Sequence, residues 1–153
     1  MVSEEIIMLK YRTEIIIDLP RSRLAELMDS FENLKKWQPD LISYENIEGK
    51  PGDKGTKTLL KYNMNRKQVD MIETIINRNF PDEFSALYEA KGVKNWVTNS
   101  FIPITENQTK WQCENIFQFS GVMAILSVFM RSAFNKQTKE YMDFFKKFAE
   151  NEK

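Results

Sequence analysis

One carboxylate in the sequence stands where it could exchange a proton with a bound molecule. Glu73 alternates with Met71 and Ile75 in a strand-forming run, so it shares one face of that strand with two apolar side chains. A carboxyl group that faces an apolar interior has a raised pKa and can act as an acid or a base. The opposite face, with Asp70 and Ile72, could equally be the inner one, and Glu73 would then be a solvated carboxylate or an ion-pair partner. Glu73 is the single candidate for a catalytic residue.

The sequence contains no histidine, so the commonest general base and the commonest metal ligand are both absent. This absence excludes Ser-His-Asp and Cys-His catalysis. The one cysteine, Cys113, has no histidine to activate it, and we expect a buried, inert thiol. Because no second cysteine accompanies it in a disulfide or a metal site, we expect neither a metal nor a cofactor.

Two further polar residues stand among apolar neighbours. Asn115 alternates with Cys113 and Phe117, and Gln137 lies on the apolar side of a helical run, close to Tyr141. Burying a side-chain amide costs free energy unless the amide finds hydrogen-bond partners. We therefore expect Asn115 and Gln137 to orient the polar end of a ligand, or to satisfy buried backbone groups, and not to catalyse.

Large apolar side chains are the most visible feature of the composition, with 11 Phe, 5 Tyr, 3 Trp and 8 Met. Such residues could line an adaptable apolar pocket, or they could fill the interior and leave no cavity. Plain core packing is the more common role for any one of them. The candidate ligand-binding residues are Tyr62, Met71, Glu73, Tyr88, Trp96, Cys113, Asn115, Phe117, Phe129, Met130, Ala133, Phe134, Gln137 and Tyr141.

The longest element that could position these residues is a helix predicted over residues 122–150. No Pro follows Pro103 and no Gly follows Gly121, so no strong helix breaker interrupts it. Such a helix is roughly 40 Å long, about the width of a small domain, and its apolar face needs a broad partner. The residues predicted on that face are Leu126, Met130, Ala133, Phe134, Tyr141, Phe144, Phe145 and Phe148.

The rest of the chain reads as strands, apart from two short helices. A strand over residues 8–19 precedes helices over 22–31 and 34–37, which Pro39 ends. Six strand-like runs follow without an intervening helix, so we expect hairpins and an antiparallel sheet. With one long helix to cover it, the sheet should curl into an α+β helix-grip fold, a single domain over residues 1–153. The six runs cover residues 41–48, 56–64, 69–78, 83–91, 93–104 and 109–119.

Charge and composition narrow the choice of partners and location. The 22 basic residues balance the 22 acidic ones, so there is no net positive charge to attract nucleic acid or an anionic membrane, and we expect no polyanion as a partner. The first residues are acidic where a signal peptide would be basic, so we expect a cytoplasmic protein. The apolar segment 116–134 includes Gln118 and Arg131 and continues into a charged helix; we expect a buried helix there and no stable membrane insertion.

Three motifs stand in order along these elements. They are Phe31 through Trp37-Gln38-Pro39, then Gly49-x-Pro51-Gly52-x-x-Gly55, then a strand from Trp111 that runs into Ser120-Gly121 and the terminal helix. In this order the chain resembles, over essentially its whole length, the helix-grip superfamily of START-type lipid carriers, bacterial polyketide cyclase or dehydratase proteins and plant pathogenesis-related ligand binders. The resemblance implies a cavity between sheet and helix that accepts an apolar or amphipathic molecule.

Three functions remain open at this point. The leading hypothesis is a binding protein that carries, senses or sequesters a hydrophobic or amphipathic small molecule between sheet and helix. The first alternative is an enzyme of the cyclase or dehydratase type in which a buried acid or amide assists proton transfer, and it requires Glu73 to point inward near Tyr88 or Asn115. The second alternative is a protein-interaction module with a filled interior and an exposed apolar patch. Sequence does not choose an oligomeric state.

Overall fold

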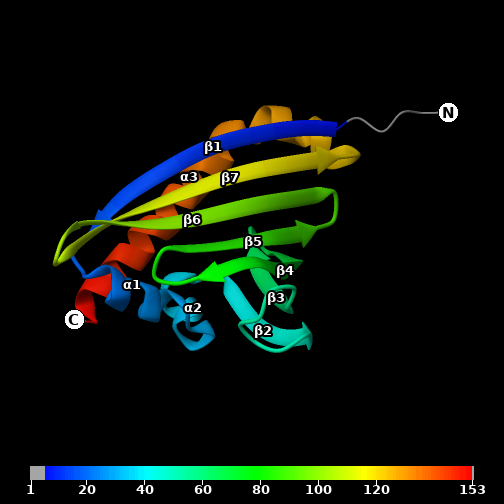
Figure 1. Ribbon diagram of the computed structural model, residues 1–153. Coiled ribbons are helices and arrows are strands. Elements are labelled where there is room, and N and C mark those ends of the chain that lie inside the picture. The colour runs from blue at the N-terminus through cyan, green and yellow to red at the C-terminus, as the bar shows by residue number, and fades with distance from the viewer. Residues whose placement is uncertain (1–5, 153) are drawn as a thin grey trace.

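The structure, a computed structural model that describes residues 6–152, has its elements in the predicted order (Figure 1). A strand, two short helices, six strands and one long helix follow each other along the chain. They are β1 (Ile6–Ile17), α1 (Arg21–Met28), α2 (Phe31–Trp37), β2 (Leu41–Glu48), β3 (Lys57–Met64), β4 (Lys67–Asn79), β5 (Glu83–Ala90), β6 (Val93–Thr105), β7 (Gln108–Ser120) and α3 (Val122–Asn151).

The strands form one antiparallel sheet in the order β1-β7-β6-β5-β4-β3-β2. Strands β2 to β7 pair with their neighbours in sequence, whereas β1 pairs with β7, so the first and last strands lie side by side. Figure 1 shows the long strands β1, β7 and β6 crossing in front of α3, with the sheet curling through β4 and β3 to β2. The predicted helix-grip fold, a curved antiparallel sheet with a long C-terminal helix, is confirmed.

The boundary between the two short helices differs from the prediction. We expected helices over residues 22–31 and 34–37, but α1 ends at Met28 and α2 begins at Phe31. Ser30 has extended backbone, and its hydroxyl accepts a hydrogen bond from the Asn33 amide at 3.3 Å, so Ser30 caps α2. The apolar spacing continues through Phe31 and conceals this break in the sequence.

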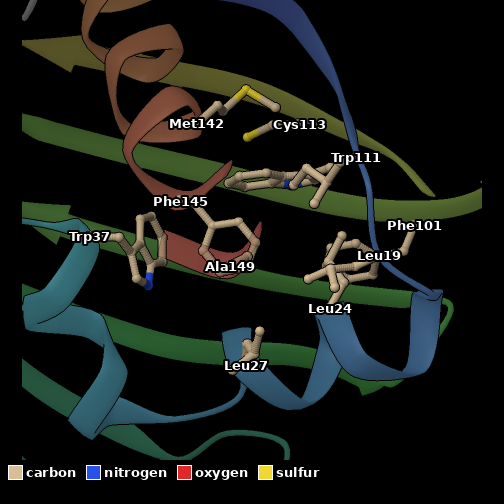
Figure 2. Packing of buried hydrophobic residues seen from close by; sticks show 11 residues of the cluster. Leu19, Leu24, Leu27, Trp37, Phe101, Trp111, Cys113, Met142, Phe145 and Ala149 are labelled. Carbon is tan, nitrogen blue, oxygen red and sulfur yellow. The ribbon is translucent and has the colours of Figure 1, made fainter. Parts of the chain in front are cut away.

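The largest core cluster lies where α1, α2 and the second half of α3 meet the sheet (Figure 2). Trp37 of α2 and Trp111 of β7 both pack edge-on against Phe145 of α3, with ring centroids 5.1 and 5.3 Å apart. Edge-to-face pairs of this kind stabilise a core beyond the area that they bury. This cluster therefore fixes the C-terminal half of α3 onto the sheet.

Helix α3 covers only part of the sheet. It contacts β1 most extensively and β7 and α2 less, while β3, β4 and β5 have few or no contacts with it. Midway along the helix, the Tyr11 hydroxyl donates to the Phe134 carbonyl at 3.1 Å and lies 2.8 Å from the Thr138 hydroxyl. The inner faces of β3 to β5 are thus left for α2, for their own side chains and for solvent.

The buried face of α3 matches the prediction only in its second half, where Phe145 is buried and Tyr141 and Phe148 are half-buried. Leu126, Met130, Ala133 and Phe144, which we placed on the apolar inner face, are exposed. Residues 122–130 are apolar all round except at one position, so their spacing defines no preferred face, and small side chains pack where the helix approaches the sheet closely. The buried residues are Ala124, Ser127, Met142, Phe145 and Ala149.

The apolar segment 116–134 is likewise not the buried helix that we expected. Its first residues complete β7, and its helical part leaves most of its large side chains in solvent. Within residues 6–152, no helix combines the length and the apolar character needed to cross a bilayer.

Candidate functional site

A row of polar side chains crosses the inner face of the sheet. Thr58, Glu73, Tyr88 and Asn95 lie directly opposite one another on β3, β4, β5 and β6. Residues opposite each other on neighbouring strands share one face of a sheet and touch. The sheet therefore brings together on its inner face two predicted site residues, Glu73 and Tyr88, and two others that the sequence did not single out.

Glu73 is the buried acid of this row, with 6% of its surface exposed. The Tyr88 hydroxyl donates a hydrogen bond to Glu73 Oε2 at 2.9 Å. Burial raises the pKa of Glu73 above its ordinary value, and the hydrogen bond from Tyr88, which favours the ionised form, opposes part of that rise. The inward orientation of Glu73, one of the two possibilities left open by the sequence, is confirmed.

Two tyrosines near Glu73 have hydroxyl groups with raised pKa values. Burial, and then the Glu73 carboxylate, raises the pKa of Tyr88 well above its ordinary value. Burial raises the pKa of Tyr62 as well, and that hydroxyl donates to Gln38 Oε1 at 2.7 Å. Both phenols are therefore hydrogen-bond donors and not bases at neutral pH, and Glu73 is the member of this group most able to change its protonation state.

A chain of side-chain amides continues the polar region toward β7. Asn95 Nδ2 donates to Asn115 Oδ1 at 3.0 Å, and Asn115 Nδ2 donates to Cys113 Sγ at 3.3 Å. Asn95 Oδ1 is buried and has no hydrogen-bond partner within the described part of the chain. Burial raises the pKa of the Cys113 thiol to about 12, as expected for an inert cysteine. The unpaired Asn95 oxygen is a free acceptor on the inner face.

An apolar row runs beside the polar one, and each of its residues is two positions away from the polar residue on the same strand. Leu60 is opposite Met71, and Val93 is opposite both Ala90 and Phe119. Met71, Ala90 and Val93 are half-buried, as are Tyr88 and Asn95 of the polar row, so both rows retain some surface accessible to solvent. The inner face of β3 to β6 is thus amphipathic and only partly covered.

Two hollows among residues 6–152 lie outside this face. One, of about 390 Å³, is an open depression lined by Asp18, Leu19, Pro20, Arg23 and Asn107. The other, of about 240 Å³, lies between α1 and the turn at Phe80 and Pro81. An enclosed cavity between sheet and α3, which the resemblance implied, is not one of these two hollows.

Half of the fourteen predicted site residues lie on the inner face of the sheet, and the other half do not. Phe134 packs on Phe117 with ring centroids 5.0 Å apart, and Tyr141 is half-buried. Trp96 is opposite Leu87 and Ile116, on the outer face of the sheet. The predicted residues on the inner face of the sheet are Tyr62, Met71, Glu73, Tyr88, Cys113, Asn115 and Phe117.

The predicted residues on the first half of α3 are not part of this face. Phe129 is 83% exposed, Met130 and Ala133 are exposed, and Gln137 is half-buried. The sequence placed Phe129, Met130 and Ala133 inside because they are apolar, and Gln137 because it is in helical register with apolar residues such as Tyr141. In the structure the face toward the sheet is made by other, smaller residues of the same turns.

The inner face contains no evident metal site. Among residues 6–152, no three side chains of Asp, Glu, Cys or His come close enough together to hold a metal ion. Glu73 stands alone as a carboxylate in the polar row, and its neighbours donate hydrogen bonds. The chemistry that the site offers is therefore hydrogen bonding and proton transfer by Glu73.

Comparison with known proteins identifies the architecture. No family model matches the sequence, and no curated protein matches it. Solved structures do match: a START superfamily protein from Mycobacterium smegmatis has a TM-score of 0.79 at 8% identity, over 94% of this chain and 99% of the other. An aromatase/cyclase from Streptomyces has a TM-score of 0.76 at 9% identity, over 94% of each chain.

A plant enzyme shows the same architecture. Norcoclaurine synthase from Thalictrum flavum, solved in complex with dopamine and hydroxybenzaldehyde, has a TM-score of 0.71 at 10% identity, over 97% of this chain and 90% of the other. At sequence identities this low, the function of a matched protein does not transfer to this chain. The TM-scores above 0.7 over nearly the whole chain show that it has the START-like helix-grip fold.

Proposed function

We propose that the protein binds a hydrophobic or amphipathic small molecule on the inner face of β3 to β6, beside α3. The observation that carries the proposal is the pair of adjacent rows, one polar and one apolar, on one partly covered face. A row that only packed a core would be more stable with apolar residues in place of Glu73 and Asn95, since burying polar groups costs free energy. A ligand with a polar end would form hydrogen bonds with Glu73 and Asn95 and so account for their presence.

The chemistry of the two rows indicates how such a ligand would lie. The unpaired Asn95 Oδ1 accepts a hydrogen bond, so it suits a hydroxyl or amide N–H of the ligand. The carboxyl of Glu73, whose pKa is raised by burial, can donate its proton to a carbonyl or accept from a hydroxyl. Met71, Ala90 and Val93, the half-buried members of the apolar row, then contact the apolar part, and the flexible Met71 side chain adapts to its shape.

Titration with an environment-sensitive fatty-acid analogue, followed by competition with lipids, sterols and aromatic compounds, tests the proposal. We expect saturable binding and a bound mass in native mass spectrometry. Asn95→Ala removes the free acceptor and should weaken an oriented ligand about twofold to tenfold, the value of one hydrogen bond. Lys94→Ala, on the outer face of the same strand, is the matched control and should leave affinity unchanged. No saturable binding across the three classes of compound would contradict the proposal.

A second candidate function is catalysis of the cyclase or dehydratase type. The observation that favours it is the buried Glu73 with its Tyr88 hydrogen bond, because an acid with a raised pKa can move a proton near neutral pH. The test is Glu73→Gln, which keeps the size and one acceptor oxygen of the side chain. Retained affinity for a β-dicarbonyl compound with loss of its turnover would support an enzyme, and equal turnover by the two proteins would refute it.

A further inference from the structure

The first turns of α3 present apolar side chains to solvent and bury a polar one. Ser127 is 1% exposed, and its hydroxyl donates to the Ala124 carbonyl at 2.8 Å. Phe129 is 83% exposed and Val122 72% exposed, although both are large and apolar. A helix that only covered its own sheet would have the reverse arrangement. The exposed apolar residues of this stretch are Val122, Ile125, Leu126, Val128, Phe129 and Met130.

The exposed apolar surface is wide. At about 100° per residue, Val128 and Met130 mark the two edges of an arc that covers about 200° of the helix circumference. A helix in the groove of a protein partner uses a stripe about 100° wide. A helix that lies in the interface of a bilayer meets lipid below and on both sides, so it uses a wider arc. The exposed start of α3, residues 122–130, has the wider arc.

The charged residues nearest this stretch on the helix are basic, and the first acidic one, Glu140, lies beyond Lys139. From Gly121 to Lys139 the chain contains three basic residues and no acidic one, although the whole chain has no net charge. Lys136 is two helical turns beyond Phe129 and therefore on the same face, and Lys139 follows one turn later. Neither lysine forms an ion pair with a carboxylate of residues 6–152.

Neighbouring strands extend the same surface. The Cβ of an alanine at position 92 would lie 3.0 Å from Met123 Cγ, so the turn between β5 and β6 touches the start of α3, and Lys91 on that turn is exposed. Ile6 is opposite Ser120, immediately before α3, and is exposed too. One end of the molecule therefore combines exposed apolar side chains with unpaired cations.

We propose that the exposed start of α3 docks on the surface of an anionic lipid bilayer. Phe129, Val122 and Ile125 enter the boundary between headgroups and acyl chains, and Lys136 and Lys139 extend toward lipid phosphates. The contact is peripheral, because residues 122–130 form a helix of only about 13 Å and no helix of residues 6–152 could cross a bilayer. This proposal stands apart from small-molecule binding, since it requires nothing on the inner face of the sheet.

A second copy of the chain is the weaker choice of partner. A symmetric dimer with parallel helices through residues 122–130 would bring Lys136 and Lys139 of two copies together with no carboxylate between Gly121 and Lys139 to neutralise them. Nine helical residues also offer less surface than the roughly 800 Å² per partner that a stable interface buries. An anionic lipid surface attracts these lysines, whereas the lysines of two copies would repel each other.

Vesicle sedimentation of the full chain tests the proposal. We expect binding to phosphatidylcholine vesicles with about 30 mol% phosphatidylserine, weaker binding to phosphatidylcholine alone, and weakening by salt. Phe129→Ser should reduce partitioning about tenfold, since an inserted phenyl ring is lost. Lys136→Gln with Lys139→Gln should reduce it about 25-fold on anionic vesicles, because each basic residue near such a surface contributes about fivefold.

Matched control variants distinguish docking through this surface from non-specific adsorption to vesicles. Ile104→Ser removes an exposed apolar residue at the far end of β6, and Lys147→Gln removes an exposed cation three turns beyond Lys136; neither should change partitioning. A fluorophore on Phe129→Cys should shift its emission to the blue on anionic vesicles, and Cys113 does not interfere because it is buried.

Two results would overturn the proposal. The first is no difference between the two vesicle types, or equal binding by the variants and the parent chain. The second is a dimer in analytical ultracentrifugation that Phe129→Ser dissociates, which would assign the surface to a second copy. Unchanged thermal unfolding of Phe129→Ser would show that a loss of vesicle binding does not come from misfolding.

Discussion

Replacing Glu73 with Gln should flatten the dependence of folding stability on pH. Burial raises the pKa of Glu73 in the folded protein above its value in the unfolded chain, about 4.3. The stability associated with the protonated form is therefore fully present below the unfolded pKa. It is lost as pH rises through the folded pKa, because the unfolded chain releases the proton first. A glutamine stays neutral throughout and removes this loss.

The magnitude follows from the number of protons. One group contributes a slope of at most about 1.4 kcal/mol per pH unit between its unfolded and folded pKa values. The Tyr88 hydroxyl, which donates to Glu73 Oε2, can donate equally to a glutamine amide oxygen, so near pH 4 the two proteins should differ by less than about 1 kcal/mol. Above that pH the variant should become progressively more stable than the parent.

Urea unfolding at a series of pH values between about 4 and 8, followed by tryptophan fluorescence, measures this difference. The chain has no histidine, so few other side chains titrate above about pH 6, and the difference between the two proteins is clearest there. Glu89→Gln, on the outer face of β5, is the control and should leave the slope intact. Parallel curves for Glu73→Gln and the parent would refute the reasoning. A variant less stable at every pH would show that the ionised carboxylate is the form that the fold requires.

Three other predictions follow from the packing. Phe145→Ala should lower the free energy of unfolding by about 3–5 kcal/mol because Phe145 is fully buried, whereas Phe129→Ala should change it by less than about 0.5 kcal/mol; urea unfolding compares them. Gly92→Ala should cost about 1–3 kcal/mol in thermal unfolding, since φ is +74° and the new methyl would press on Met123. Cys113, with a pKa of about 12, should react with a thiol reagent at least about a hundredfold more slowly in the native protein than in urea.

The sequence predicted the fold well where its periodicity had a single interpretation. In β7, Trp111, Cys113 and Phe117 alternate with polar residues, and this strand lies with that face inward. The length of α3 was equally clear because no breaker interrupts it. Over residues 122–130 the periodicity fails, since nearly every residue is apolar and the helical pattern is the same on all faces. Contact with the sheet decides which face of the helix is buried there, and the local sequence pattern gives no information about that contact.

The site was predictable in part. The orientation of Glu73 was ambiguous because Ile72 on the opposite face of β4 is also apolar; pairing with Tyr88 decided it. Asn95 alternates with Val93 and Val97 and had the same signal as Asn115, but it was missed. Trp96 was chosen instead for its size, which says nothing of the face on which a side chain lies.

The two halves of α3 use the sheet in different ways, and this difference bears on function. The second half buries large side chains such as Met142 and Phe145, so most of the packing energy of the helix lies there. The first half buries the small Ala124 and Ser127, and its large residues contribute little to folding from their exposed positions. Polar side chains in place of Phe129 would leave the fold as stable and the surface better solvated, so stability does not account for them. A contact with a partner outside the chain accounts for these exposed apolar residues. The surface lies beside Val93 and Met123, at the end of the sheet where the apolar row of the inner face begins.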